Sequence, residues 1–116
     1  MNDDLMALIE RAVTGWPGVT TGDTGRGGLQ FRYRRVELGH LHGASCADLP
    51  FTRKVRDELI ATGQAEVHPP LPDSGWVRRQ IDCPAGAEAV IALLRMNYDR
   101  ARARDARGAA RQGEVA

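Results

Sequence analysis

The sequence is poor in cysteine, with only Cys46 and Cys83 among its 116 residues. The two form no C-x-x-C pair, which excludes a zinc knuckle and a thioredoxin-like redox motif. We interpret both as free thiols in a reducing cytoplasm. Each is expected to pack as a small buried hydrophobic side chain.

Long apolar runs are also absent. No stretch approaches the ~20 apolar residues that a membrane-spanning helix needs. The chain starts with Met-Asn-Asp-Asp, which is acidic, whereas a secretory signal opens with basic residues and continues with an apolar run. We therefore expect a cytoplasmic protein that does not associate with a membrane.

The chain has no large excess of one charge. Its formal net charge is +1. Residues 99–116 hold five arginines and three acidic residues, and the remaining 98 residues hold 11 basic and 12 acidic ones. The mild basicity thus belongs to the C-terminal segment, and the balance elsewhere argues against a nucleic-acid partner.

Several motifs of catalysis and cofactor binding are missing. Residues 22–28 are rich in glycine but lack the Gly-Lys-Ser/Thr of a phosphate loop, so we interpret them as a turn between two strands. Ser74 has no Gly-x-Ser-x-Gly context, which argues against a nucleophilic serine. Since there is no dinucleotide fingerprint either, we expect no flavin or nicotinamide cofactor.

Apolar residues make up 42% of the chain and recur at helical spacing in three segments. The first predicted helix covers residues 3–14, and the last covers residues 86–103. The middle helix is expected to open at residues 47–50, with Asp48 as its N-cap, and to end at Gly63.

The C-terminal segment has no apolar stripe of this kind. Residues 104–116 are rich in arginine, alanine and glycine. We expect them to form a flexible tail behind a single domain of residues 1–103.

Period-two alternation predicts strands between the helices. Apolar and polar residues alternate at 29–33 and again at 36–42, a short strand fits residues 65–68, and a further strand fits residues 76–82. Tight turns between strands indicate antiparallel pairing. The order predicts an α+β fold: an antiparallel sheet of about four to six strands, with N-terminal, middle and C-terminal helices packed mainly on one face.

All three histidines lie in two short segments of the predicted sheet. His40 and His42 are two residues apart on a strand and point to the same side, and His68 precedes a proline-rich loop. The three could bind a transition metal as a facial triad, or they could line an organic pocket and exchange protons near neutral pH. Glu37 has the wrong parity to join them in a regular strand, which a bulge at Gly39 would correct.

The segment Ser74-Gly75-Trp76 follows the proline-rich loop. A stiff loop with a hydroxyl group beside a large aromatic ring suits one wall of a ligand pocket. The alternative for Trp76 is a core anchor at the start of a strand.

Three motifs occur in order: Glu-Leu-Gly-His-x-His-Gly at 37–43, Ala-Asp-Leu-Pro-Phe at 47–51 and Ser-Gly-Trp at 74–76. In this spacing they resemble the luciferase-domain family of small bacterial proteins, and the likeness runs from Trp16 to Arg100. The family takes its name from fungal luciferases, which oxidise a hydroxypyrone with molecular oxygen and need no flavin or nicotinamide. One departure is Pro69, because in the family a second histidine often follows the one at His68.

The resemblance implies binding of a small aromatic or enolic molecule, and a cofactor-independent oxygenase (an oxidoreductase) as the enzymatic form of that function. In this hypothesis His40 or His68 removes a proton, Glu37 orients an imidazole and Trp76 covers the ligand. The resemblance implies two groups of site residues. The catalytic residues are Glu37, His40, His42 and His68, and the substrate-binding residues are Asp48, Arg56, Ser74 and Trp76.

A fainter likeness to the MmcQ/YjbR-like proteins rests on the pattern from Trp76 to Tyr98 and implies the same α+β fold. It raises a competing hypothesis, an interaction module that binds nucleic acid or a protein partner. Such a module would use the C-terminal tail and the arginines at 32, 34 and 35, although Phe31 and Tyr33 are expected to face the core rather than a ligand.

Overall fold

The computed structural model describes residues 2–25, 27–42 and 45–115. Three helices and one six-stranded antiparallel sheet make an α+β fold, which confirms the predicted class. The strands lie in the order β1-β2-β3-β4-β6-β5. The helices are α1 (Asn2–Thr14), α2 (Arg53–Ala61) and α3 (Pro84–Val115), and the strands are β1 (Val19–Asp23), β2 (Leu29–Tyr33), β3 (Val36–His42), β4 (Cys46–Pro50), β5 (Glu66–Val67) and β6 (Trp76–Gln80).

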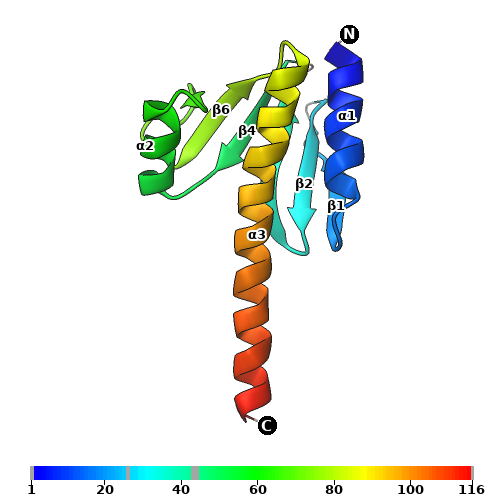
Figure 1. Cartoon of the computed structure of the whole chain (residues 1–116), viewed down its shortest axis with the longest axis vertical. Coiled ribbons are helices and arrows are strands. Elements are labelled where there is room, and N and C mark those ends of the chain that lie inside the picture. The colour runs from blue at the N-terminus through cyan, green and yellow to red at the C-terminus, as the bar shows by residue number, and fades with distance from the viewer. Residues whose placement is uncertain (1, 26, 43–44, 116) are drawn as a thin grey trace.

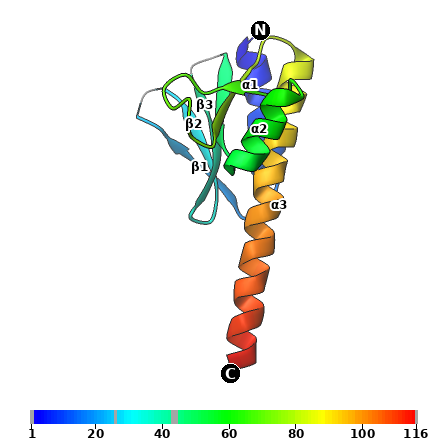
Figure 2. The same ribbon diagram turned by 90° about the vertical axis from the view of Figure 1, so that its left-hand side faces the viewer.

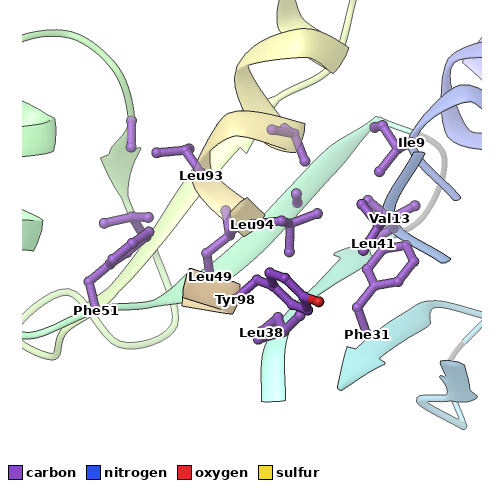
Figure 3. Close-up of a cluster of buried hydrophobic side chains, with 14 of the residues drawn as sticks. Ile9, Val13, Phe31, Leu38, Leu41, Leu49, Phe51, Leu93, Leu94 and Tyr98 are labelled. Carbon is purple, nitrogen blue, oxygen red and sulfur yellow. The ribbon is translucent and has the colours of Figure 1, made fainter. Parts of the chain in front are cut away.

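The three helices lie on the same side of the sheet (Figure 2). Helix α3 crosses the middle strands and α1 runs beside it (Figure 1). Apolar residues of β2, β3 and β4 fill the space beneath these helices, since their alternate side chains point to this face. Figure 3 shows the main members of this core: Ile9, Val13, Phe31, Leu38, Leu41, Leu49, Leu94 and Tyr98.

Strands β2 and β3 form a hairpin whose turn lies at Arg34 and Arg35. Arg34 adopts φ 56°, a left-handed conformation that tight turns require. The turn fixes Tyr33 opposite Val36. This turn and one bulge described below thus determine which face of the sheet each later residue of β3 occupies.

The prediction of a helix opening at residues 47–50 is wrong. These residues belong to β4, a central strand whose first four residues are all buried. Burial on both faces removes the alternation that marks a strand, and the Asp-x-Pro pattern imitates a helix start. Helix α2 instead begins at Arg53, where the Thr52 hydroxyl accepts a 3.3 Å hydrogen bond from the Val55 amide. Its end at Gly63, with φ 75°, agrees with the prediction.

Helix α3 is longer than predicted, because it continues past residue 103 to Val115. Its buried stripe ends at Ala101, but alanine and arginine favour helix and no proline follows to end it. The second half extends beyond the sheet (Figure 1). The flexibility of residues 104–116 stays a prediction. Among the described residues, no helix is long and apolar enough to cross a membrane.

The two cysteines differ in burial. Cys46 is buried on β4, as expected, whereas Cys83 is exposed just before α3. The expectation of burial is therefore wrong for Cys83, which lies in the connection between β6 and α3, where no strand or helix covers it.

Candidate functional site

The sheet face opposite the helices carries a row of polar side chains. Residues directly opposite one another on neighbouring strands share a face. Gln30 lies opposite His40, His40 opposite Asp48, and Asp48 opposite Arg78. Glu66 on β5 extends the row, because it lies opposite Arg78. One line of the sheet thus brings together side chains from five strands.

A bulge in β3 brings Glu37 to this row. The β2–β3 register shifts between Phe31 and Arg32, so that Phe31 lies opposite Gly39 while Arg32 lies opposite Glu37. Gly39 has φ 153°, which an L-residue adopts only with strain. As a result Glu37 Oε2 lies 2.7 Å from His40 Nδ1, the contact that a bulge at Gly39 was expected to allow.

Helix α3 holds this irregular segment from the other face. The buried Asn97 side chain donates 2.9 Å hydrogen bonds from Nδ2 to the carbonyl oxygens of Leu38 and Pro50. Leu38 is the extra residue of the bulge. Buried carbonyl groups need such partners. Asn97, which lies on the helix-covered side of the sheet, therefore fixes the geometry of the opposite, polar face.

Asp48 lies at the centre of the cluster and is only 2% exposed. Arg78 binds it with two hydrogen bonds, from Nε to Oδ1 at 2.7 Å and from Nη2 to Oδ2 at 3.1 Å. The Nε2 atoms of His68 and His40 lie 3.2 Å and 3.5 Å from the same Oδ2. A buried carboxylate is stable only with partners of this kind, so Asp48 organises three cationic or polarisable groups around itself.

The cluster fixes the charge of His40. Hydrogen bonds with Asp48 and Glu37 raise the pKa of His40 to about 9. Burial opposes ionisation of Asp48, but hydrogen bonds with His40 and Arg78 outweigh it and lower the Asp48 pKa well below its ordinary value. At neutral pH His40 is therefore an imidazolium with both N–H groups directed at carboxylates. It stabilises the cluster and has no free nitrogen for a proton or a metal.

His68 differs from His40 in having one unoccupied nitrogen. A carboxylate can only accept, so the Nε2 atom that faces Asp48 carries the proton. The Nδ1 atom is buried and has no hydrogen-bond partner among the described residues. In the neutral ring this atom is a lone-pair acceptor, held in place by Asp48.

Trp76 packs against both histidines. Its ring centroid lies 5.5 Å from that of His40 and 5.9 Å from that of His68, with tilted planes. Pro70 and Leu71 of the preceding loop line the same groove. The indole ring is therefore part of a site wall on the polar face, and it lies outside the buried core.

These groups line an open groove of about 570 Å³, a volume typical of small-molecule sites. Most of the residues predicted for the site meet there. His42 lines its outer part and is exposed. The remaining predicted residues that line it are Glu37, His40, Asp48, His68 and Trp76.

Two predicted ligand-binding residues, Arg56 and Ser74, do not line this groove. The Arg56 guanidinium donates to the Pro72 carbonyl oxygen. The Ser74 hydroxyl donates to the Leu71 carbonyl oxygen at 2.7 Å and accepts from the Trp76 amide at 3.1 Å. Both residues shape the loop that carries Trp76.

The groove residues that sequence reasoning missed include Gln30, Arg32 and Arg78. Their strand parity is visible in the sequence, because each alternates with a core residue. The missing information is the register between strands, which pairs Arg78 with Asp48 across 30 positions of sequence.

No group of three or more histidine, cysteine, aspartate or glutamate side chains is arranged to hold a metal ion within residues 2–25, 27–42 and 45–115. The geometry of the imidazoles explains this for the triad considered from the sequence. Both nitrogens of His40 face carboxylate oxygens, and Nε2 of His68 faces Asp48.

Comparison with protein families gives one match: the family described as Luciferase domain, over residues 35–97. This is more than half of the 116 residues. It includes the bulge, β4, the loop and Trp76, and so nine of the 13 residues that line the groove. Comparisons with curated proteins and with solved structures give no match.

Proposed function

The chain belongs to the luciferase-domain family, and on this premise we propose that its groove binds a small aromatic or enolic molecule and passes the acidic proton of that molecule to His68. The observation that carries the proposal is the pair Asp48–His68. The carboxylate fixes one imidazole nitrogen at 3.2 Å, and the other nitrogen has no partner among the described residues.

His40 and His68 have different roles in this proposal. His40 is an imidazolium at neutral pH, since its pKa is raised to about 9 by its bonds with Asp48 and Glu37. It supplies positive charge near a developing enolate or phenolate, which electrostatic stabilisation favours. His68 is the general base in this proposal, because its Nδ1 lone pair has no hydrogen-bond partner among the described residues.

Trp76 supplies the aromatic wall of the proposed site. A planar ligand that packs on the exposed part of the indole ring would lie next to both imidazoles. Aromatic faces bury apolar ligand surface while polar groups fix the orientation. This division of contacts favours a ligand with one flat ring system and one acidic hydroxyl group.

The reaction class that the family implies is oxygenation without a flavin or nicotinamide. Proton removal gives an enolate or phenolate, the electron-rich form that molecular oxygen oxidises. The residues of the groove account for that first step, and molecular oxygen is the oxidant. Binding and proton removal are therefore the parts of the proposal that variants of this chain test directly.

The test is a thermal-shift screen of hydroxypyrones and phenols with wild type, His68→Gln and a control variant. A ligand at 100 times its dissociation constant stabilises the folded state by about 2.7 kcal/mol. The control is Asp57→Asn, because Asp57 is exposed and does not line the groove. We expect wild type and Asp57→Asn to show the shift and His68→Gln to lose most of it. A His68→Gln protein that is folded by circular dichroism and binds as wild type does would refute the role of His68.

A second candidate function, nucleic-acid binding, is favoured by one arrangement. Arg34 and Arg35 of the β2–β3 turn line a shallow groove together with Arg104 of α3. Only Arg34 among these pairs with an acid in the described structure, at 3.6 Å from Asp105. Arginines from two elements thus form one basic surface at the base of the extended helix.

This candidate makes its own prediction about salt. Phosphate contacts weaken steeply as salt rises, because binding releases counterions. Fluorescence anisotropy with labelled single-stranded RNA should therefore show affinity that falls between 50 and 200 mM salt, as is typical of such contacts. It should also fall in the variant Arg35→Gln/Arg104→Gln. Absence of binding at the lowest salt would exclude this function.

A further inference from the structure

Arg32 is the one cation of the groove that no described carboxylate neutralises. Arg78 is paired with Asp48, and His40 with Glu37 and Asp48. Arg32 instead donates from Nε to the neutral amide oxygen of Gln30 at 2.6 Å. No ion pair joins its guanidinium to an acid within the part of the chain that the structure describes.

One acid, Asp23, lies at the same end of the groove. Its Oδ1 accepts a 2.7 Å hydrogen bond from the Gly25 amide, which directs the carboxylate to its own turn. Arg32 lines the groove, and no hydrogen bond of its two terminal guanidinium nitrogens is found among the described residues. A planar fork of this kind matches a carboxylate with two parallel hydrogen bonds.

A continuous chain of hydrogen bonds and ion-pair contacts links Arg32 to the proposed base. Gln30 accepts from Arg32 and donates from Nε2 to Glu37 Oε1 at 2.9 Å. Glu37 contacts His40, His40 contacts Asp48, and Asp48 contacts His68. A chain in which each group fixes the next holds the two ends at a set separation.

That separation follows from the sheet. Arg32 lies on β2 and the His68 ring reaches back to Asp48 on β4. Neighbouring strands are about 4.8 Å apart and successive residues of a strand about 3.3 Å apart. Arg32 lies two strands from Asp48 and two residues along β2 from Gln30, which shares the line of His40 and Asp48, so the backbone positions of Arg32 and Asp48 are about 12 Å apart across the sheet. Trp76 packs beside His68, so the aromatic part of the ligand would lie at the His68 end of the groove.

We propose that the ligand of this groove carries a carboxylate at the end opposite its acidic hydroxyl group, and that Arg32 is the specificity-determining residue that binds this carboxylate. The inference rests on the proposed function, since it takes His68 as the site of the hydroxyl group. It adds a substrate class: aromatic or enolic acids with the two functions at opposite ends of a flat molecule.

The probe is a hydroxybiphenyl carboxylic acid with the phenol and the acid at opposite ends, together with its methyl ester. The two differ in the charge of one end and keep the phenol and both rings. Dissociation constants measured by calorimetry should favour the acid at least tenfold in wild type. Arg32→Gln should abolish that preference, and Arg32→Lys should keep part of it, since an ammonium retains the charge without the fork.

Arg35→Gln is the matched control, because it removes the same charge from an exposed residue that does not line this groove. It should leave the preference for the acid unchanged. Equal binding of acid and ester by wild type would refute the inference. If His68→Gln then weakened both ligands alike, the proposed function would still stand. No binding of either ligand would count against both.

Discussion

The two faces of one sheet are built on opposite principles, and β4 shows both in adjacent residues. Leu49 is fully buried beneath α3 with apolar neighbours. Asp48 is 2% exposed, yet it contacts two histidines and an arginine. Equal burial thus serves two purposes. Non-directional packing makes the helix-covered face stable, while paired charges make the open face specific in geometry.

The two faces also depend on each other at one place, the bulge of β3. Leu38 and Gly39 are both buried, so two consecutive residues of β3 take the place of one in the regular alternation. The Glu37 side chain therefore lies on the polar face. Asn97 holds the bulge from the helix side. The contrast between the faces therefore gives two kinds of variant: those that damage one face only, and those that should damage both through the bulge.

The largest effect is expected from Leu49→Ala, a change on the helix-covered face. Removing a fully buried leucine side chain costs about 2–5 kcal/mol of unfolding free energy, because a cavity is left in the core. Urea denaturation followed by circular dichroism measures the loss. Leu71→Ala is the control, since Leu71 is 49% exposed and its loss should change stability by less than about 0.5 kcal/mol.

Asp48→Asn is the corresponding change on the open face. It leaves Arg78 and His40 without their shared carboxylate, and breaking a buried ion pair is strongly destabilising. Because both partners are partly exposed, we expect a loss of roughly 2–3 kcal/mol, measured by the same denaturation.

Asp57→Asn offers a matched control for this variant. Asp57 pairs with Arg56 at 2.7 Å, but its side chain is 66% exposed, and such pairs contribute little. If Asp48→Asn were as mild as Asp57→Asn, the cluster would not be the organised unit that its distances indicate. The His40 proton should also dissociate at lower pH in Asp48→Asn, which NMR titration can follow.

The contrast between the faces also explains which parts the sequence could predict. Strands β2, β3 and β6 each have one polar and one apolar face, so their alternation is visible in the residues. Strand β4 is buried on both faces, and its Asp-x-Pro pattern indicated a helix cap instead. The same error concealed Asp48 as the centre of the site, because a capping residue would lie at the surface.

Local pattern nevertheless carried part of the site. The spacing of His40 and His42 placed both on one face, and Gly39 indicated a bulge that could bring Glu37 to His40. Arg32 and Arg78 could not be assigned in this way, since their roles depend on which strands become neighbours. That pairing is set by contacts between residues far apart in the sequence, and the local pattern of residues does not reveal which strands become neighbours.

A pH titration of stability tests the charge of the open face. The His40 pKa rises from 6.5 to about 9 on folding, so in this range the folded protein binds more protons than the unfolded chain. The resulting stabilisation is fully present below pH 6.5 and is lost as pH rises through about 9. We expect a loss of up to about 3 kcal/mol over that window.

The variant His40→Gln isolates this contribution, since the pH dependence between neutral and pH 9 should then become nearly flat. A wild-type unfolding free energy that rises across the window would contradict the assigned charge state. The lowered Asp48 pKa acts at the acid end, where stability should fall as pH drops below the ordinary range of a carboxyl group.

Gly39→Ala should damage both faces through the bulge. A Cβ atom would lie 3.0 Å from the Asp48 carbonyl oxygen and 3.0 Å from Leu94 Cδ2, and φ 153° is strained for alanine. We expect a loss of about 1–3 kcal/mol and a lower His40 pKa, because Glu37 moves away. Gly22→Ala is the control, where the nearest atom would be 3.9 Å away. A stable Gly39→Ala protein with an unchanged His40 titration would show that the bulge does not position Glu37.

The smallest effect is expected in the reactivity of the two cysteine thiols. Their reaction rates report how accessible the Cys46 end of β4 is to solvent. Cys46 lies two residues before Asp48 on β4, and burial raises the pKa of its thiol. Cys83 is exposed. Because the thiolate is the reactive form, a chromogenic disulfide reagent at pH 8 should modify one thiol per folded chain rapidly. The second thiol should react only on unfolding. Cys83→Ser should remove the fast phase without altering stability. If both thiols of the folded wild type reacted at one rate, the end of β4 would open readily to solvent, and the rigid spacing of the site across the sheet would lose its support.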